Sequence, residues 1–235
     1  MIDENYWDDI DLRLERFLED GFVKLPSIAN FELDEIANSI NSEMDGATFA
    51  ELCPSHKLFL DELGLHKFLT PKLYDIAKTL FGFKGGMSNQ YHIARRVEPG
   101  NSKEMFRAHF DSHLFTLVLP IKIPKVKNDG TVGELIYFPN ARKSPVSEIS
   151  NFISKVSYKR YASKEGMINF AKTNTQYTDN FFDYSPLLFF GNTTLHTNKK
   201  VSQECSSYRL TLLAHFFDPS PKYGVAALLR SLRNR

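Results

Sequence analysis

The sequence predicts a mainly β protein with helices on the outside of its sheets. Three observations support this: an amphipathic pattern near the N-terminus, a series of short β-rich runs from about residue 86, and Gly, Pro and Asn residues between those runs. The 235 residues are enough for one domain with a substantial core. We therefore expect a single domain over residues 1–235.

The first part of the chain, about residues 1–85, is predicted to be mostly helical. A first amphipathic helix should end near Gly21, and a short apolar strand should follow over residues 22–26. A third helix should begin with Thr70 as its cap and Pro71 at its first position, and should end at Gly82. The buried side chains of the first two helices would be Trp7, Ile10, Leu14 and Phe17, then Leu33, Ile36, Ile40 and Met44.

The β core is expected over about residues 86–220. A segment over about residues 141–185 has weaker periodicity, apart from a predicted helix from Ser163 to Lys172. Long inserts in compact domains are usually functional, so this insert is a candidate lid or substrate-selecting segment. The predicted strands are Asn89 to Val97, Leu114 to Ile123, Glu134 to Phe138, Pro186 to Phe190 and Tyr208 to Phe217.

Composition and charge exclude several classes of protein. The 29 basic and 28 acidic residues leave a net charge of +1, which would not gather nucleic acid or an anionic membrane. The N-terminus is acidic and unlike a signal peptide, and no apolar stretch approaches a membrane span. We therefore expect a cytoplasmic protein, with Cys53 and Cys205 reduced.

A metal site is predicted around His109 and Asp111. Residues two apart in an extended chain face the same side, so both side chains can enter one cavity while Phe110 points away. One imidazole and one carboxylate need a second histidine to complete the two-His-one-carboxylate set used for non-haem iron. His196 is the strongest candidate, because it follows an apolar strand and a Gly-Asn turn.

Arg209 lies on a further predicted strand whose alternate residues could face the same cavity. A buried guanidinium requires an anionic partner, and its planar fork suits a carboxylate.

These four residues carry a resemblance to the phytanoyl-CoA dioxygenase-like branch of the Fe(II)/2-oxoglutarate oxygenases. His109, Asp111, His196 and Arg209 match, in order, the family's His-x-Asp pair, distal histidine and downstream arginine. Residues 17–26 also resemble the family's N-terminal entry, and residues 133–139 resemble a strand in the middle of its chain. The resemblance implies a double-stranded β-helix, the cupin-like jelly-roll, with Fe(II) held by the triad and 2-oxoglutarate held by Arg209.

The implied reaction is oxidation of a small-molecule substrate by O2, with hydroxylation as the default and with release of succinate and CO2. Related halogenases have a small residue where Asp111 stands, so its carboxylate favours oxidation without halogen transfer. Two alternatives remain: a cupin-type iron dioxygenase that does not use 2-oxoglutarate, against which Arg209 argues, and a non-catalytic cupin-like binding module. The substrate and the oligomeric state stay open.

Further residues are candidates for contacts in the site. Ser112, Asn198, and either Tyr91 or His92 could contact the co-substrate. His113 is expected near the metal without binding it, whereas His215 is expected in the core. In the loop over residues 139–142, Pro-Asn-Ala-Arg stands where relatives often carry Gly-Ser-His, and residues 226–233 could form a short docking helix. A rim that attracts an anionic substrate could be formed by Arg95, Arg96, Arg107, Arg142, Lys199 and Lys200.

Overall fold

Two antiparallel β-sheets that face each other form the centre of the computed structural model, which describes residues 4–101, 107–126, 130–145, 154 and 156–219. The larger sheet has the strand order β1-β7-β4-β9-β3-β2 and the smaller sheet has the order β6-β5-β8. This confirms the predicted β core. The strands are β1 (Phe22–Lys24), β2 (Phe49–Glu51), β3 (Gln90–Val97), β4 (Phe115–Lys122), β5 (Leu135–Phe138), β6 (Tyr177–Asp179), β7 (Leu187–Phe190), β8 (Leu195–Asn198) and β9 (Arg209–Phe216).

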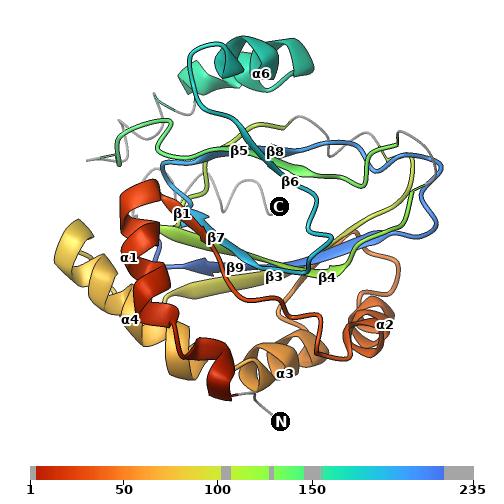
Figure 1. Ribbon diagram of the computed structural model, residues 1–235, viewed down its shortest axis with the longest axis horizontal. Coiled ribbons are helices and arrows are strands. Elements are labelled where there is room, and N and C mark those ends of the chain that lie inside the picture. The colour runs from red at the N-terminus through yellow and green to blue at the C-terminus, as the bar shows by residue number, and fades with distance from the viewer. Residues whose placement is uncertain (1–3, 102–106, 127–129, 146–153, 155, 220–235) are drawn as a thin grey trace, which may run out of the picture.

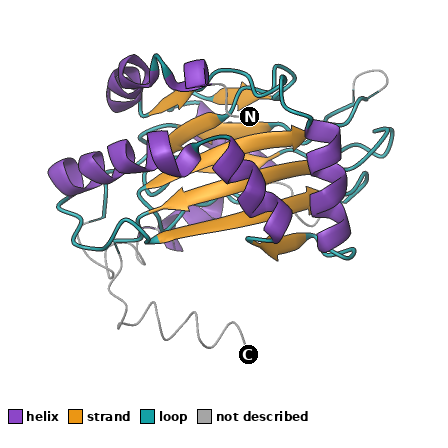
Figure 2. Cartoon of the chain, turned by 90° about the horizontal axis from the view of Figure 1, so that it is seen from below, coloured by secondary structure: helices purple, strands orange, loops and turns teal. Residues whose placement is uncertain are grey.

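Helices cover the outer faces of both sheets. The helices of the N-terminal part lie below and beside the larger sheet in Figure 1, while the helix of the insert stands above the smaller sheet. Figure 2, the view from below, shows helices crossing the strands. The helices are α1 (Ile10–Asp20), α2 (Leu33–Glu43), α3 (Pro54–Glu62), α4 (Leu65–Phe81) and α6 (Lys164–Ala171), with short 3-10 turns at Glu4–Trp7 and Lys159–Tyr161.

The first helix ends as predicted, but α4 begins earlier than predicted. Gly21 adopts a left-handed conformation with φ 83° and its N–H donates to the carbonyl of Phe17, which closes α1. α4 already begins at Leu65, so Thr70 is not its cap and Pro71 lies inside the helix. The hydroxyl of buried Thr70 donates to the carbonyl of Leu65. The pattern of α3 was missed altogether, although Pro54 marks its first turn.

The buried residues form three layers of apolar packing. The largest cluster joins α1–α4 to the larger sheet, a second fills the space between the two sheets, and a third joins the smaller sheet to α6. Because side chains alternate along a strand, β5 supplies two of these layers. Leu135 and Tyr137 face the space between the sheets, whereas Ile136 and Phe138 face α6.

The helical part of the predicted insert packs on the outside of the smaller sheet. Ser163 accepts a hydrogen bond from the Gly166 N–H, which caps α6 as predicted. Met167 and Phe170 of α6 contact the outer face of the sheet. α6 is thus on the face opposite the space between the sheets, which argues against this helix as a lid, whereas Phe181 at the end of the insert lies between the sheets. Residues 146–153 and 155 lie outside the described residues, as does the helix predicted over 226–233.

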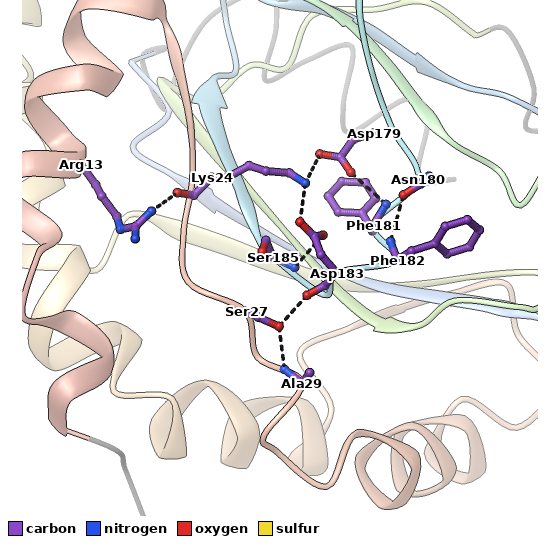
Figure 3. Close-up of polar contacts among 10 residues, drawn as sticks. All are labelled: Arg13, Lys24, Ser27, Ala29, Asp179, Asn180, Phe181, Phe182, Asp183 and Ser185. Atoms are coloured by element: carbon purple, nitrogen blue, oxygen red, sulfur yellow. Dashed lines mark hydrogen bonds and ion pairs between the residues drawn. The ribbon is translucent and has the colours of Figure 1, made fainter.

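A partly exposed ion-pair network ties the edge of the larger sheet to the end of the smaller one (Figure 3). The ammonium of Lys24 on β1 lies 2.9 Å from carboxylate oxygens of both Asp179 and Asp183. Asp179 is 8% exposed and accepts a hydrogen bond of 2.8 Å from the N–H of Phe181. These contacts fix Phe181, which is fully buried between the sheets.

His56, on the buried face of α3, predicts a loss of stability in mild acid. The ring is fully buried and neither nitrogen has a hydrogen-bond partner among the described residues. Burial lowers the pKa of His56 from 6.5 to about 4. As the pH falls from 6.5 towards 4, only the unfolded chain gains this proton, so the free energy of unfolding falls by about 1.4 kcal/mol per pH unit.

Replacing His56 by leucine should remove this contribution. Between pH 7 and pH 5 the variant should lose about 2 kcal/mol less than the parent, measured by urea unfolding at both values. His66→Gln, at a ring that is 38% exposed, is the control and should retain the parental pH dependence. Equal losses in the parent and the leucine variant would contradict the assignment.

Both cysteines, Cys53 and Cys205, are free. In the described residues, no helix is long and apolar enough to cross a membrane.

Candidate metal centre and anion pocket

The predicted histidines meet at the edge of the two sheets. The backbone of His109 pairs with that of His196 through two hydrogen bonds of 3.1 Å, one in each direction. This short antiparallel bridge aligns the loop before β4 with β8. The intervening Phe110 points outward into the layer under α6, as predicted.

Three side chains converge at this point. Asp111 Oδ1 lies 3.6 Å from His109 Nε2 and 3.7 Å from His196 Nε2. The ligand atoms of all three residues lie within 4.8 Å of one another. The predicted triad is therefore assembled with two nitrogens and one oxygen facing a common centre, a set suited to a divalent first-row metal.

Hydrogen bonds orient both rings for metal binding. His109 Nδ1 lies 2.7 Å from the carbonyl of Arg107, and His196 Nδ1 lies 3.1 Å from the carbonyl of Thr194. A carbonyl oxygen only accepts, so Nδ1 carries the proton in each ring. Each Nε2 then keeps its lone pair for a metal, which is the arrangement usual for histidine ligands.

The carboxylate of Asp111 is held in its charged form. Burial would raise the pKa of Asp111, but the neighbouring rings of His196, His215 and His109 and the Thr116 hydroxyl together lower it below its usual value. The side chain is only 10% exposed, and the Thr116 hydroxyl donates to Oδ2 at 2.5 Å. A charged oxygen, Oδ1, remains beside the two imidazole nitrogens.

The triad opens into a cavity of about 190 Å³ between the two sheets. Its walls come from alternate residues of β3, β4 and β9 and from β5, β7 and β8. The lining residues are Ile93, Arg95, His109, Asp111, Thr116, Val118, Leu135, Phe189, His196, Asn198, Arg209, Thr211, Leu213 and His215.

Arg209 enters this cavity as a buried cation. The residue is 4% exposed, and within the described part of the chain no carboxylate forms an ion pair with it. The Phe181 ring lies beside it, with its centroid 5.8 Å from the guanidinium carbon. Burial, and then the nearby Arg95, lower the pKa of Arg209 to about 10, although the carboxylates of Glu134 and Asp179 act in the opposite direction, so Arg209 stays charged at neutral pH. The cavity thus holds a cation that no carboxylate of the described residues contacts directly, and an anionic ligand could pair with it.

The other predicted contacts are distributed unequally. Asn198 lines the cavity, and its amide donates to the carbonyl of Gly133 at 3.1 Å. Ser112 is outside the lining. Tyr91 shares the inner face of β3 but lies beyond the cavity, where its hydroxyl donates to Glu51. His92 lies on the opposite face, buried near the His56 and His66 rings, so we drop it from the site.

Most of the predicted basic rim lies elsewhere. Arg95 lines the cavity, whereas Arg96 stacks over Tyr208 on the other face of β3. Arg142 stacks on Phe110 and donates to the Asn192 carbonyl, within the layer under α6. The cavity lining includes neither Arg107 nor Lys199 and Lys200.

Sequence reasoning missed three polar residues of the cavity. His215 was expected in the core, and Thr116 and Thr211 were not considered, yet all three line the cavity. The signal was present in the period of two along β9, because positions 211, 213 and 215 share the face of Arg209.

The absence of a side chain at Gly191 leaves space for Thr116 and Asp111. A Cβ there would lie 2.6 Å from Thr116 Oγ1, 2.8 Å from the His113 carbonyl and 3.1 Å from Asp111 Cβ. Gly191→Ala should therefore push Asp111 out of position and cost about 1–3 kcal/mol of stability, as overpacking does.

The measurement is metal affinity together with urea unfolding. Gly86→Ala, where the nearest neighbour of an added Cβ is Ser88 Oγ at 3.7 Å, should leave metal affinity unchanged. A Gly191 variant with parental metal affinity would show that the backbone at residue 191 shifts without moving Asp111.

Comparison with solved structures identifies the fold. A prolyl 4-hydroxylase from Phytophthora capsici has a TM-score of 0.56 at 12% identity, over 98% of this chain and 72% of that one. A prolyl hydroxylase from Trichoplax adhaerens, in complex with a hypoxia inducible factor peptide, has a TM-score of 0.54 at 11% identity, over 92% and 91%. The chain has the jelly-roll fold of these oxygenases.

A third similar structure is the non-heme alpha ketoglutarate dependent epimerase SnoN from nogalamycin biosynthesis. Its TM-score is 0.50 at 13% identity, over 93% of this chain and 88% of that one. No protein-family model matches the sequence, and no curated protein is significantly similar to it. The comparisons therefore establish the predicted fold, while the chemistry has to be argued from the site.

Proposed function

We propose that the chain is a non-haem Fe(II)- and 2-oxoglutarate-dependent oxygenase that hydroxylates a small-molecule substrate. The observation that carries the proposal is the pairing, in one cavity, of a two-His-one-carboxylate set with a buried cation that forms no ion pair with a carboxylate among the described residues. A structural metal site would not need Arg209. An anionic co-substrate would pair with the Arg209 guanidinium at one end, and the other end of the co-substrate would lie beside the triad.

The residues have separate tasks in this proposal. His109, Asp111 and His196 would hold Fe(II), which when bound supplies the activation of O2 for attack on a C–H bond. Arg209 would bind the distal carboxylate of 2-oxoglutarate through paired N–H···O bonds. One oxygen atom of O2 would enter succinate, formed with loss of CO2, and the other would enter the substrate as a hydroxyl group.

The apolar walls have the task of keeping water away from the reacting atoms. Val118, Leu135, Phe189 and Leu213 line the cavity and are buried or partly buried. Hydrogen bonds and charges are stronger in such a dry environment, which favours tight binding of the co-substrate carboxylate.

The comparisons support the class of reaction more than its outcome. The similar structures include prolyl hydroxylases and an epimerase on the same fold. Hydroxylation is the proposed default because Asp111 retains the carboxylate that the related halogenases lack. The phytanoyl-CoA dioxygenase-like branch remains our proposal for the closer relationship, on the four motif residues.

The decisive experiment is an anaerobic titration of the apo-protein with Fe(II) and then 2-oxoglutarate, followed by exposure to O2. We expect a weak visible charge-transfer band after the second addition, and succinate after the third. Iron binding without the band would favour a 2-oxoglutarate-independent dioxygenase. Metal binding without the band and without any consumption of 2-oxoglutarate would equally fit the non-catalytic binding module.

A further inference from the structure

We infer that Thr116 and His215 form a positioning pair that makes Asp111 bind the metal through Oδ1 alone. The inference rests on the proposed function, because it concerns how that metal would be held. Neither residue is among the expected ligands, and both lie in the wall of the same cavity.

The two oxygens of Asp111 have different surroundings. Oδ1 faces the triad, at 3.6 Å and 3.7 Å from the two Nε2 atoms. Oδ2 accepts the Thr116 hydroxyl at 2.5 Å and lies 3.8 Å from His215 Nδ1. A hydrogen bond this short to a charged oxygen is strong, so it competes with rotation of Oδ2 towards the metal.

His215 determines the direction of the Thr116 hydroxyl. A hydroxyl has one proton, and because a charged carboxylate only accepts, Thr116 donates that proton to Asp111. The contact of 3.1 Å between Thr116 Oγ1 and His215 Nδ1 must then have the ring N–H as its donor. The two hydrogen bonds therefore run in one direction, towards the triad: the His215 Nδ1–H donates to Thr116, and the Thr116 hydroxyl donates to Asp111.

The sheet holds this pair in place. Thr116 on β4 and His215 on β9 are direct cross-strand partners, so neither can shift without breaking the register of the larger sheet. The His215 ring lies nearly parallel to the rings of His113, at 5.1 Å, and Tyr91, at 6.2 Å between centroids. The Tyr91 hydroxyl in turn donates to Glu51.

Single-oxygen binding by Asp111 would keep metal positions open. A carboxylate that bound with both oxygens would occupy two positions, whereas 2-oxoglutarate and O2 together need every position that the three residues leave. The pair would thereby act through Asp111, without contact to the metal or the substrate.

The test is Co(II) binding to the anaerobic apo-protein, followed by the visible spectrum of the bound ion and without any assay of activity. Thr116→Val, which keeps the shape and removes the hydroxyl, should weaken Co(II) binding about 10- to 100-fold and alter the spectrum. Thr116→Ser should restore both. Thr197→Val is the matched control, because the Thr197 hydroxyl is buried next to His196 without a partner among the described residues.

A second pair of variants separates orientation from packing. His215→Asn retains an N–H near the position of Nδ1 and should bind Co(II) within a few-fold of the parent, whereas His215→Phe retains only the ring and should resemble Thr116→Val. Parental affinity and spectrum in both Thr116→Val and His215→Phe would overturn the inference and leave the proposed function standing. Failure of the parent itself to bind Co(II) would overturn both.

Discussion

Replacing Asp111 by alanine should abolish metal binding and leave the fold intact. The substitution removes the only charged ligand of the triad, and even partners outside the ligand set typically cost 10- to 100-fold, so affinity should fall by more than about 100-fold. The fold should persist because the Thr116 hydroxyl keeps His215 as a hydrogen-bond partner. The measurement is anaerobic Fe(II) or Co(II) titration, with thermal unfolding of the apo-protein alongside.

Asp183→Ala is the control for removal of a carboxylate. Asp183 is 54% exposed, pairs with Lys24 and does not line the cavity, so its loss should cost less than about 1 kcal/mol and leave metal affinity unchanged. Tight metal binding by the Asp111 variant would mean that the two histidines suffice, and the three-ligand assignment would fail.

Replacing Arg209 by methionine should have two opposite effects. The 2-oxoglutarate affinity should fall by about 100-fold or more, because a buried charge-assisted pair of hydrogen bonds is lost. The apo-protein should become more stable, because a buried guanidinium that forms no ion pair among the described residues is replaced by an apolar side chain of similar length. Each kcal/mol gained should raise the Tm by about 2–4 °C in a chain of this size.

The measurement is thermal unfolding with and without 2-oxoglutarate, together with Fe(II) affinity, which should stay at the parental value. Arg96→Met is the control, because Arg96 lies on the outer face of β3 over Tyr208 and should not affect 2-oxoglutarate. A lower Tm in the apo Arg209 variant would show that the cation is already stabilised in the empty cavity. Unchanged 2-oxoglutarate affinity would remove Arg209 from the anion site.

The stability gain expected for the Arg209 variant has a functional meaning. A binding pocket that keeps a charge without a partner is destabilised until the ligand arrives, and the ligand then gains the full interaction. The Lys24 network is the opposite case. The carboxylates of Asp179 and Asp183 already pair with the Lys24 ammonium, so no ligand is needed there.

The sequence by itself predicted the class of fold and the three residues that converge in the candidate metal site. The periods of two and of three to four residues are local properties, so they predicted α1, α2 and most strands, and they placed His109 and Asp111 on one face. Local sequence signals gave the wrong helix boundary where tertiary packing determined it. Pro71 looked like a helix start, but the burial of Leu65 and Leu69 extends α4 backwards past it.

Only the tertiary structure decided which distant residues share the cavity. The choice between Tyr91 and His92, the role of His215 and the absence of most of the basic rim depend on which strand lies beside β3 and which face of each strand turns inward. Pairing β4 with β9 brings Thr116 to His215 across 99 positions of sequence. Such contacts have no local pattern, because the energy that selects them comes from burying both sheets at once.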